Sequence, residues 1–182
     1  MGALGGQFEA QAFVKMAADD RATIVQAASD LKGDHLLRES TAAALAARTG
    51  KPPLTMLWYP TTGPDTTGTD PLADARARGV DGLFNVSLEA FGLAMGEDTD
   101  TFGVFVRIRA QLAESAGGEL RYERVIEHGP GRPLPGMPRP STYTLEFLAL
   151  DEARVFRHEM GEAIRGLAAV VAADPALPLA AH

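Results

Sequence analysis

The sequence predicts an α/β protein of the α+β kind, with a mixed sheet that ends in an antiparallel three-strand meander and with helices packed on it. Residues 82–127 contain three consecutive segments in which apolar and polar residues alternate. Successive side chains of a strand point to opposite faces, so this alternation indicates strands with one buried face. The links at 95–100 and 114–118 are short and rich in Gly, Asp and Ser, as hairpin connections are. We therefore expect meander strands at 83–93, 101–113 and 120–127.

Two further strands are expected before the meander. Residues 54–59 form a short apolar run that follows Pro52 and Pro53. Residues 7–16 alternate as a strand would, but their helix-forming composition leaves a helix open as the alternative. Residues 19–21 are expected to form a turn, and residues 22–30 are ambiguous.

Three helices are expected. The first covers residues 34–48, with Asp34 capping its free amides and Gly50 ending it. The second is short, begins at Asp70-Pro71 and ends at Gly79. The third begins at Phe147 or Asp151 and runs to Ala173. Its expected apolar stripe is Phe156, Met160, Ala163, Ile164, Leu167 and Val171.

The length of 182 residues is typical of one domain, which we place at residues 7–174. Residues 1–6 are expected to be a flexible lead and residues 175–182 a disordered tail. Residues 129–140 contain so many Pro and Gly that no regular element is expected there, only an exposed loop or flap.

Composition excludes several classes of function. The net charge of −7 argues against nucleic acid as a partner, since such proteins carry clustered Lys and Arg. The chain has no Cys, which rules out disulfides, thiolate metal sites and cysteine nucleophiles. No apolar run is long enough to span a bilayer, and the first residues lack the pattern of a signal peptide. Met1 is thus either a native start or follows a removed leader.

Candidate catalytic and metal-binding motifs are incomplete. His158-Glu159 resembles the start of a zinc-protease motif, but Glu162 stands where the second His is required, so a solvated helix face is expected. The acidic run at 96–100 lacks the remaining ligands of a calcium loop and is expected to be a hairpin tip. The loop at 61–70 lacks the Lys of a phosphate-binding loop. We therefore expect no catalytic residue, no metal and no cofactor.

Six residues are candidates for partner binding. Trp58 and Tyr59 stand at a strand end, where they either pack in the core or anchor a partner. The other four share the polar parity of the meander, where they either support a helix or offer a patch to a partner. These four are Phe91, Phe105, Arg107 and Arg109.

Three stretches carry a resemblance to a known family. Residues 80–93, Val-Asp-Gly-Leu-Phe-Asn-Val-Ser-Leu-Glu-Ala-Phe-Gly-Leu, look like a strand of bacterial envelope lipoproteins. Residues 102–112 followed by Gly117-Gly-Glu-Leu-Arg-Tyr122 are similar to the next hairpin of those proteins, and residues 150–171 to their closing helix. The chain thus resembles, over roughly residues 34–173, the group that includes the curli-secretion lipoprotein, the TolB amino-terminal domain and the penicillin-binding-protein activator lipoproteins.

The resemblance implies a non-enzymatic domain that docks onto other cell-envelope proteins as an assembly or secretion-accessory subunit. It implies a periplasmic place with tethering to the outer membrane, although this chain has no Cys to carry a lipid anchor. If Met1 is the native start, a cytoplasmic place is expected instead. Two other functions stay open: a ligand-binding protein or enzyme with a cleft between the 61–70 loop and the Pro-rich flap, and a self-assembling structural subunit.

Overall fold

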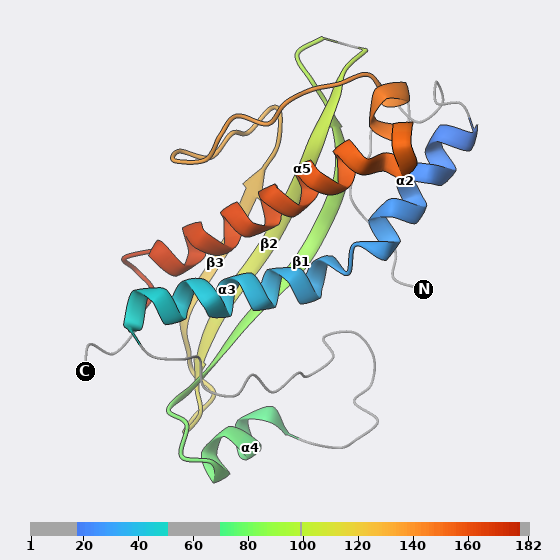
Figure 1. The fold of residues 1–182 in the computed structure, drawn as a ribbon. Coiled ribbons are helices and arrows are strands. Elements are labelled where there is room, and N and C mark those ends of the chain that lie inside the picture. Colours follow the sequence, from blue (N-terminus) through green and yellow to red (C-terminus); the bar gives the residue numbers. More distant parts are fainter. Residues whose placement is uncertain (1–17, 51–69, 99, 179–182) are drawn as a thin grey trace.

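The computed structural model describes residues 18–50, 70–98 and 100–178, and within them it confirms the predicted α+β class. A three-stranded antiparallel sheet in the order β1-β2-β3 is backed by helices on one face (Figure 1). In chain order the elements are α2 (Ala18–Asp30), α3 (Gly33–Thr49), α4 (Pro71–Ala77), β1 (Gly82–Met95), β2 (Phe102–Glu114), β3 (Leu120–His128) and α5 (Leu145–Ala173).

The meander is confirmed, with each strand within two residues of its expected bounds. β2 is central and pairs antiparallel with both β1 and β3. Val106, Ile108 and Ala110 of β2 are fully buried, whereas the residues between them are only half-buried. We call the buried side the inner face and the opposite side the outer face. The two further strands predicted at 7–16 and 54–59 lie outside the described residues.

A β-bulge at Glu89 changes which residues of β1 face the core. Leu88 pairs with Ile108, but Ala90 pairs with Arg107, so Glu89 is an extra residue in the ladder. Because side chains alternate along a strand, one extra residue exchanges the two faces beyond it. Phe91 consequently pairs with Val106 on the inner face and packs against the core. The prediction that Phe91 shares a face with Phe105, Arg107 and Arg109 is therefore wrong.

The helix predicted at 34–48 is α3, and its end is as expected. Gly50 adopts the left-handed conformation, with φ 67°, and its N–H bonds to the carbonyl of Ala46. The start differs from the prediction, because the N-cap is Lys32 and no side chain caps the helix. The Asp34 carboxylate instead accepts the backbone N–H of Leu88 at 3.2 Å. Asp34 thus holds the edge of β1 beside the bulge.

Two shorter helices precede the sheet. Asp70 caps α4 as predicted, since its carboxylate accepts the N–H of Leu72 at 3.0 Å and Pro71 follows it. The turn expected at 19–21 is wrong, because these residues form the first turn of α2, with Asp19 and Asp20 at its positive end.

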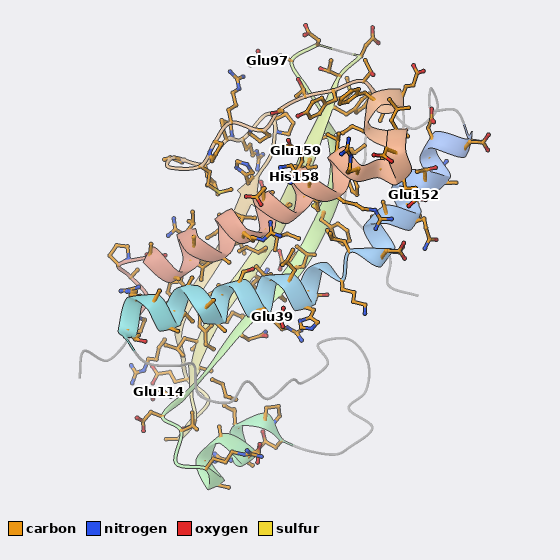
Figure 2. The ribbon with its side chains drawn as sticks, in the orientation of Figure 1. Glu39, Glu97, Glu114, Glu152, His158 and Glu159 are labelled. Atoms are coloured by element: carbon orange, nitrogen blue, oxygen red, sulfur yellow. The ribbon has the colours of Figure 1, made fainter. Side chains whose placement is uncertain are left out.

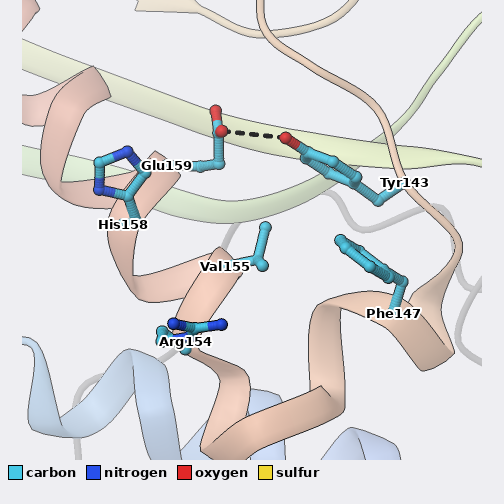
Figure 3. A pocket seen from close by; sticks show the side chains of 6 residues that line it. All are labelled: Tyr143, Phe147, Arg154, Val155, His158 and Glu159. Atoms are coloured by element: carbon cyan, nitrogen blue, oxygen red, sulfur yellow. Dashed lines mark hydrogen bonds between the residues drawn. The ribbon is translucent and has the colours of Figure 1, made fainter.

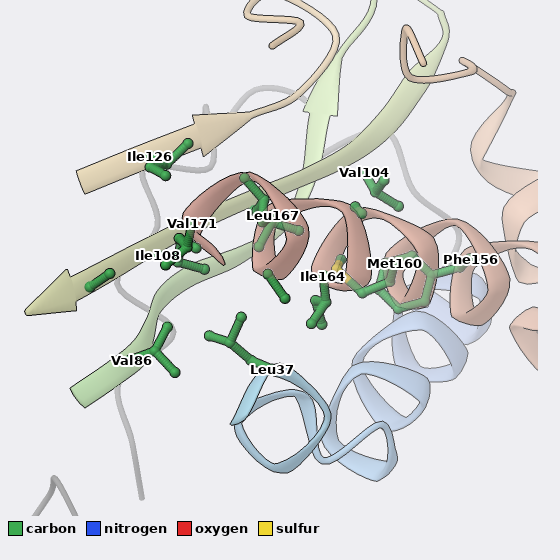
Figure 4. Packing of buried hydrophobic residues seen from close by; sticks show 14 of the residues in the cluster. Leu37, Val86, Val104, Ile108, Ile126, Phe156, Met160, Ile164, Leu167 and Val171 are labelled. Carbon is green, nitrogen blue, oxygen red and sulfur yellow. The ribbon is translucent and has the colours of Figure 1, made fainter. Parts of the chain in front are cut away.

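One hydrophobic core joins the inner face of the sheet to α2, α3 and α5 (Figure 4). The predicted stripe of α5 is confirmed, because all six of its residues are buried. Figure 4 shows this stripe between the sheet and α3. The labelled side chains are Leu37, Val86, Val104, Ile108, Ile126, Phe156, Met160, Ile164, Leu167 and Val171.

A left-handed turn divides α5 into a short first piece and a long second piece. Asp151, Glu152 and Ala153 have φ values of 53°, 54° and 59°. Left-handed backbone costs non-glycine residues roughly 1–2 kcal/mol each. Of the two starts considered from sequence, Phe147 lies two residues after the actual start at Leu145, whereas Asp151 is wrong as a start because it lies within the left-handed turn. Figure 1 shows the two pieces at an angle to each other.

The Pro-rich segment after β3 has no helix or strand, as predicted, but it packs against α5. Met137 lies against Gly166 of α5, where the absence of a Cβ leaves room for its side chain. The segment returns to the sheet at Tyr143, which exchanges two backbone hydrogen bonds of 2.7 and 2.8 Å with Phe102. Residues 175–178 were expected to belong to a disordered tail, but Leu177 is only 2% exposed and packs in the core.

Candidate functional site

Three of the six predicted partner-binding residues lie together on the outer face of the sheet. Phe105, Arg107 and Arg109 follow one another at alternate positions of β2 and point away from the helices. Phe91 lies on the inner face because of the bulge, and Trp58 and Tyr59 lie outside the described residues. The outer face is therefore the part of the predicted site that the fold assembles.

The outer face carries a ladder of opposite charges that crosses all three strands. Arg107 Nε donates to Glu89 of β1 at 2.9 Å, and its Nη1 lies 3.3 Å from a carboxylate oxygen of Glu127 on β3. Arg109 donates to Glu89 as well, and its Nη1 lies 2.5 Å from Glu123 of β3. We call these five residues the outer-face ladder: Glu89, Arg107, Arg109, Glu123 and Glu127.

The bulge at Glu89 makes this arrangement possible. The extra residue places the Glu89 carboxylate within reach of both arginines on the neighbouring strand. The hydrogen bond from Arg109 is the main cause that lowers the pKa of Glu89, and Arg107 adds to it against the effect of burial. The hydrogen bonds to Glu89 and then Glu123 raise the pKa of Arg109. Since both arginine side chains are more than a third exposed, at 42% and 36%, solvent screens these pairs and each contributes little to the stability of the fold.

A second site, which the sequence did not predict, lies beside the left-handed turn of α5. The turn sets the first piece of α5 against the next turns of the helix and leaves an open depression of about 410 Å³ (Figure 3). We call it the α5 depression. It is lined by Tyr143, Phe147, Arg154, Val155, His158 and Glu159.

The α5 depression combines two aromatic rings with charged groups. The rings of Tyr143 and Phe147 stack with their centres 5.3 Å apart and their planes at 19°. The Tyr143 hydroxyl donates to Glu159 at 3.1 Å. Figure 3 shows Arg154 and His158 on the other side of Val155 from these rings.

The structure places His158 and Glu159 in a setting that the sequence did not indicate. They lie on α5, as expected, and Figure 2 shows them on the helix surface. This helix face is not fully solvated as expected, because Glu159 accepts a hydrogen bond from Tyr143, which lies in the segment that precedes α5. The sequence contains only a weak sign of the left-handed turn, since Asp151 tolerates that conformation but Glu152 and Ala153 favour a helix.

The acidic hairpin tip lies next to a second, smaller hollow. This hollow of about 290 Å³ is bounded by Glu97 and Asp98 on one side and by Pro130, Arg139 and residues 140–142 on the other. Arg139 forms an ion pair with Glu97 across it. Across residues 18–50, 70–98 and 100–178, no three His, Asp or Glu side chains converge as a metal site would require.

Within the same ranges, no helix combines the length and the apolar character needed to cross a bilayer. The chain matches no family model, no curated protein and no solved structure.

Proposed function

We propose that the chain is a non-enzymatic docking module that binds other proteins of the cell envelope through the outer face of its sheet. The observation that carries the proposal is the one-sided arrangement of the fold. The helices α3 and α5 contact the sheet at its inner face, and within the described residues no helix covers the outer face. Among the described residues, this face is therefore open to a partner.

The side chains on this face suit protein recognition. Arginine is enriched at protein interfaces because its planar guanidinium binds carboxylates with two hydrogen bonds and stacks on flat groups. The outer-face ladder holds Arg107 and Arg109 in fixed positions, which reduces the side-chain entropy that binding would cost. Apolar contact area is available beside the ladder from Phe105 and from Val125, which is 38% exposed.

The charge pattern indicates the kind of partner. On the outer face, a central row of two arginines is flanked by Glu89 on one side and by Glu123 and Glu127 on the other. A partner with a row of carboxylates between rows of basic side chains would match it. The match would steer association and fix the orientation of the complex more than it would raise affinity.

The envelope location is the part of the proposal that depends on the resemblance to envelope lipoproteins. Fractionation of the native host with an antibody against the chain checks it. Recovery with the periplasm or the outer membrane is the expected result, and recovery with cytoplasmic markers alone would contradict this location.

Site-specific photo-crosslinking in the native host tests the docking surface. A photoreactive residue at Gln111, on the outer face, should give discrete crosslinked products. The same residue at Arg165, which is exposed on α5, should give none of them. Replacement of Arg107 and Arg109 by Gln should remove the products from Gln111 and lower the melting temperature only modestly, because solvent screens the ion pairs that are lost.

Two results would contradict the proposal. One is an absence of crosslinks at Gln111, or the same products from Gln111 and Arg165. The other is a single product that contains only this chain, which would assign the outer face to self-association in place of an envelope partner.

A further inference from the structure

The α5 depression has a chemistry that the docking function does not use. It brings apolar, cationic and anionic groups to one small open space of about 410 Å³. That volume lies within the range of small-molecule sites, roughly 300–1,000 Å³. Its residues come from two segments, since Tyr143 precedes α5 and the others belong to α5 itself.

The apolar part of the depression is exposed without cover among the described residues. Phe147 is 44% exposed, and it is the only Phe, Trp or Tyr among the exposed large side chains of the described chain. Tyr143 stacks on one side of Phe147, and Val155 lines the depression with it. A ligand with an apolar group would bury this surface against two rings and a branched side chain.

The charged groups of the depression, Arg154, His158 and Glu159, lie around Val155 on α5. Arg154 and His158 are one helical turn apart and so lie on one face of α5. The ion pair of Arg154 with Asp151 does not occupy the guanidinium fully, because both side chains are more than two thirds exposed and arginine has five donors. Glu159 uses one oxygen to accept from Tyr143, and a carboxylate can accept on both oxygens.

The backbone beside the depression is strained, which is a separate observation. Three consecutive non-glycine residues, Asp151 to Ala153, hold the left-handed conformation. Strain of this kind concentrates at ligand sites, where the surrounding structure maintains it. Here the left-handed turn interrupts the helix and places Phe147 across the depression from Arg154 and Val155.

We propose that the α5 depression binds a free α-amino acid with an apolar side chain. The α-carboxylate binds Arg154 and His158, the α-ammonium binds Glu159, and the side chain packs on Phe147 and Val155. A simple anion would leave Glu159 repelling it, and a simple cation would be repelled by Arg154. A zwitterion is the ligand class that satisfies both signs of charge in so small a space.

Titration of the isotopically labelled chain, followed by amide NMR shifts, tests the proposal with three probes of one shape. The probes are L-phenylalanine, 3-phenylpropionate, which lacks the ammonium, and phenethylamine, which lacks the carboxylate. L-Phenylalanine should shift amides of residues 143–159 in the millimolar range or below. Each truncated probe should bind about tenfold more weakly, as expected when one charge-assisted hydrogen bond is lost.

Variants connect the binding to the residues. Arg154→Gln should weaken the binding of L-phenylalanine about tenfold, so that the variant binds L-phenylalanine no more tightly than phenethylamine. Glu159→Gln should bind L-phenylalanine no more tightly than 3-phenylpropionate, while the Gln oxygen still accepts the hydrogen bond from Tyr143. Arg165→Gln is the matched control, because Arg165 forms an exposed i,i+3 ion pair on the same helix just as Arg154 does.

The outcomes separate clearly. Equal affinity for the three probes, shifts scattered over the chain, or an equal effect of Arg165→Gln and Arg154→Gln would overturn the proposal. An absence of shifts in the millimolar range would overturn it as well. None of these results bears on docking through the outer face, which lies on a different element.

Discussion

At the scale of single residues, Asp174 does the most to connect distant parts of the chain. It ends α5, and its carboxylate is only 4% exposed. The carboxylate accepts hydrogen bonds from Tyr122 at 2.9 Å and from Ala176 N–H at 2.9 Å, and it forms an ion pair with Arg124. Burial acts to raise the pKa of Asp174, but the hydrogen bonds from Ala176, Arg124 and Tyr122 together lower it. The end of α5 is thus tied to β3.

This cluster predicts a loss of stability in strong alkali. Burial and then the hydrogen bond to Asp174 raise the pKa of Tyr122 from 10.0 to about 12. The folded state therefore retains the Tyr122 proton at pH values where the unfolded state releases it. The contribution of this shift to stability is complete below pH 10 and is lost as the pH rises from 10 to about 12.

Denaturant unfolding of the wild type and Tyr122→Phe at several alkaline pH values measures this effect. The variant has no phenol to ionise, so the difference in unfolding free energy between the two proteins should shift against the wild type as the pH rises through this window. A difference that stays constant from pH 9 to pH 12 would show that Tyr122 titrates alike in both states.

At the scale of elements, the bulge in β1 decides which side chains reach the core. The alternation of residues 83–88 could be read directly from sequence, but the exchange of faces at Glu89 could not. Glu is not a residue type that marks a bulge, and Ala90 fits either face. What selects the bulge is tertiary: it places Phe91, Leu93 and Met95 against the core and places Glu89 between two arginines.

Deletion of Glu89 should therefore destabilise the protein far more than Glu89→Ala. Without the extra residue, the regular ladder turns Phe91, Leu93 and Met95 to the outer face and loses their burial. Full burial of a large apolar side chain contributes about 1.5–3 kcal/mol, and these three side chains are partly buried, so their combined loss should be about 3 kcal/mol. Glu89→Ala keeps the chain length and loses only ion pairs to solvent-exposed arginines, which contribute little to stability. Chemical denaturation of both variants measures the difference, and similar losses would argue against the bulge.

Helix α5 shows a related limit of sequence-based prediction. Its buried stripe from Phe156 to Val171 was predictable, because apolar residues at helical spacing leave one consistent solution. Its left-handed turn was not, since helix-forming residues occupy it. The return of the chain to β2 at Tyr143 and the burial of Leu148 and Ala153 fix that turn through contacts distant in sequence.

At the scale of the whole molecule, the described elements other than α4 share one core. Side chains of α2, α3, α5 and the sheet belong to a single buried cluster, with Phe156 fully buried in it. The sheet has no second hydrophobic layer within the described residues, so α5 and α3 supply the cover for its inner face. We therefore expect helices and sheet to unfold together.

Phe156→Ala tests this expectation. Loss of a fully buried Phe should lower the unfolding free energy by about 3–5 kcal/mol, because burial is lost and a cavity remains. Transitions followed by circular dichroism, which reports helices, and by the amide NMR signals of β2 and β3, which report the sheet, should coincide and move together. Separate transitions in the wild type would show that the sheet and the helices do not form one cooperative unit.

The sequence by itself determined the three meander strands, the helices α3 and α4, the stripe of α5 and the positions of Gly50 and Asp70. Each follows from local periodicity or from the backbone preference of one residue, and these act over a few neighbours. Only the tertiary structure decided the face of Phe91, the use of Asp34 to hold β1, the outer-face ladder and the α5 depression. Each of these depends on partners many residues away, such as Leu88 for Asp34, and a contact of that kind forms only when the layers pack.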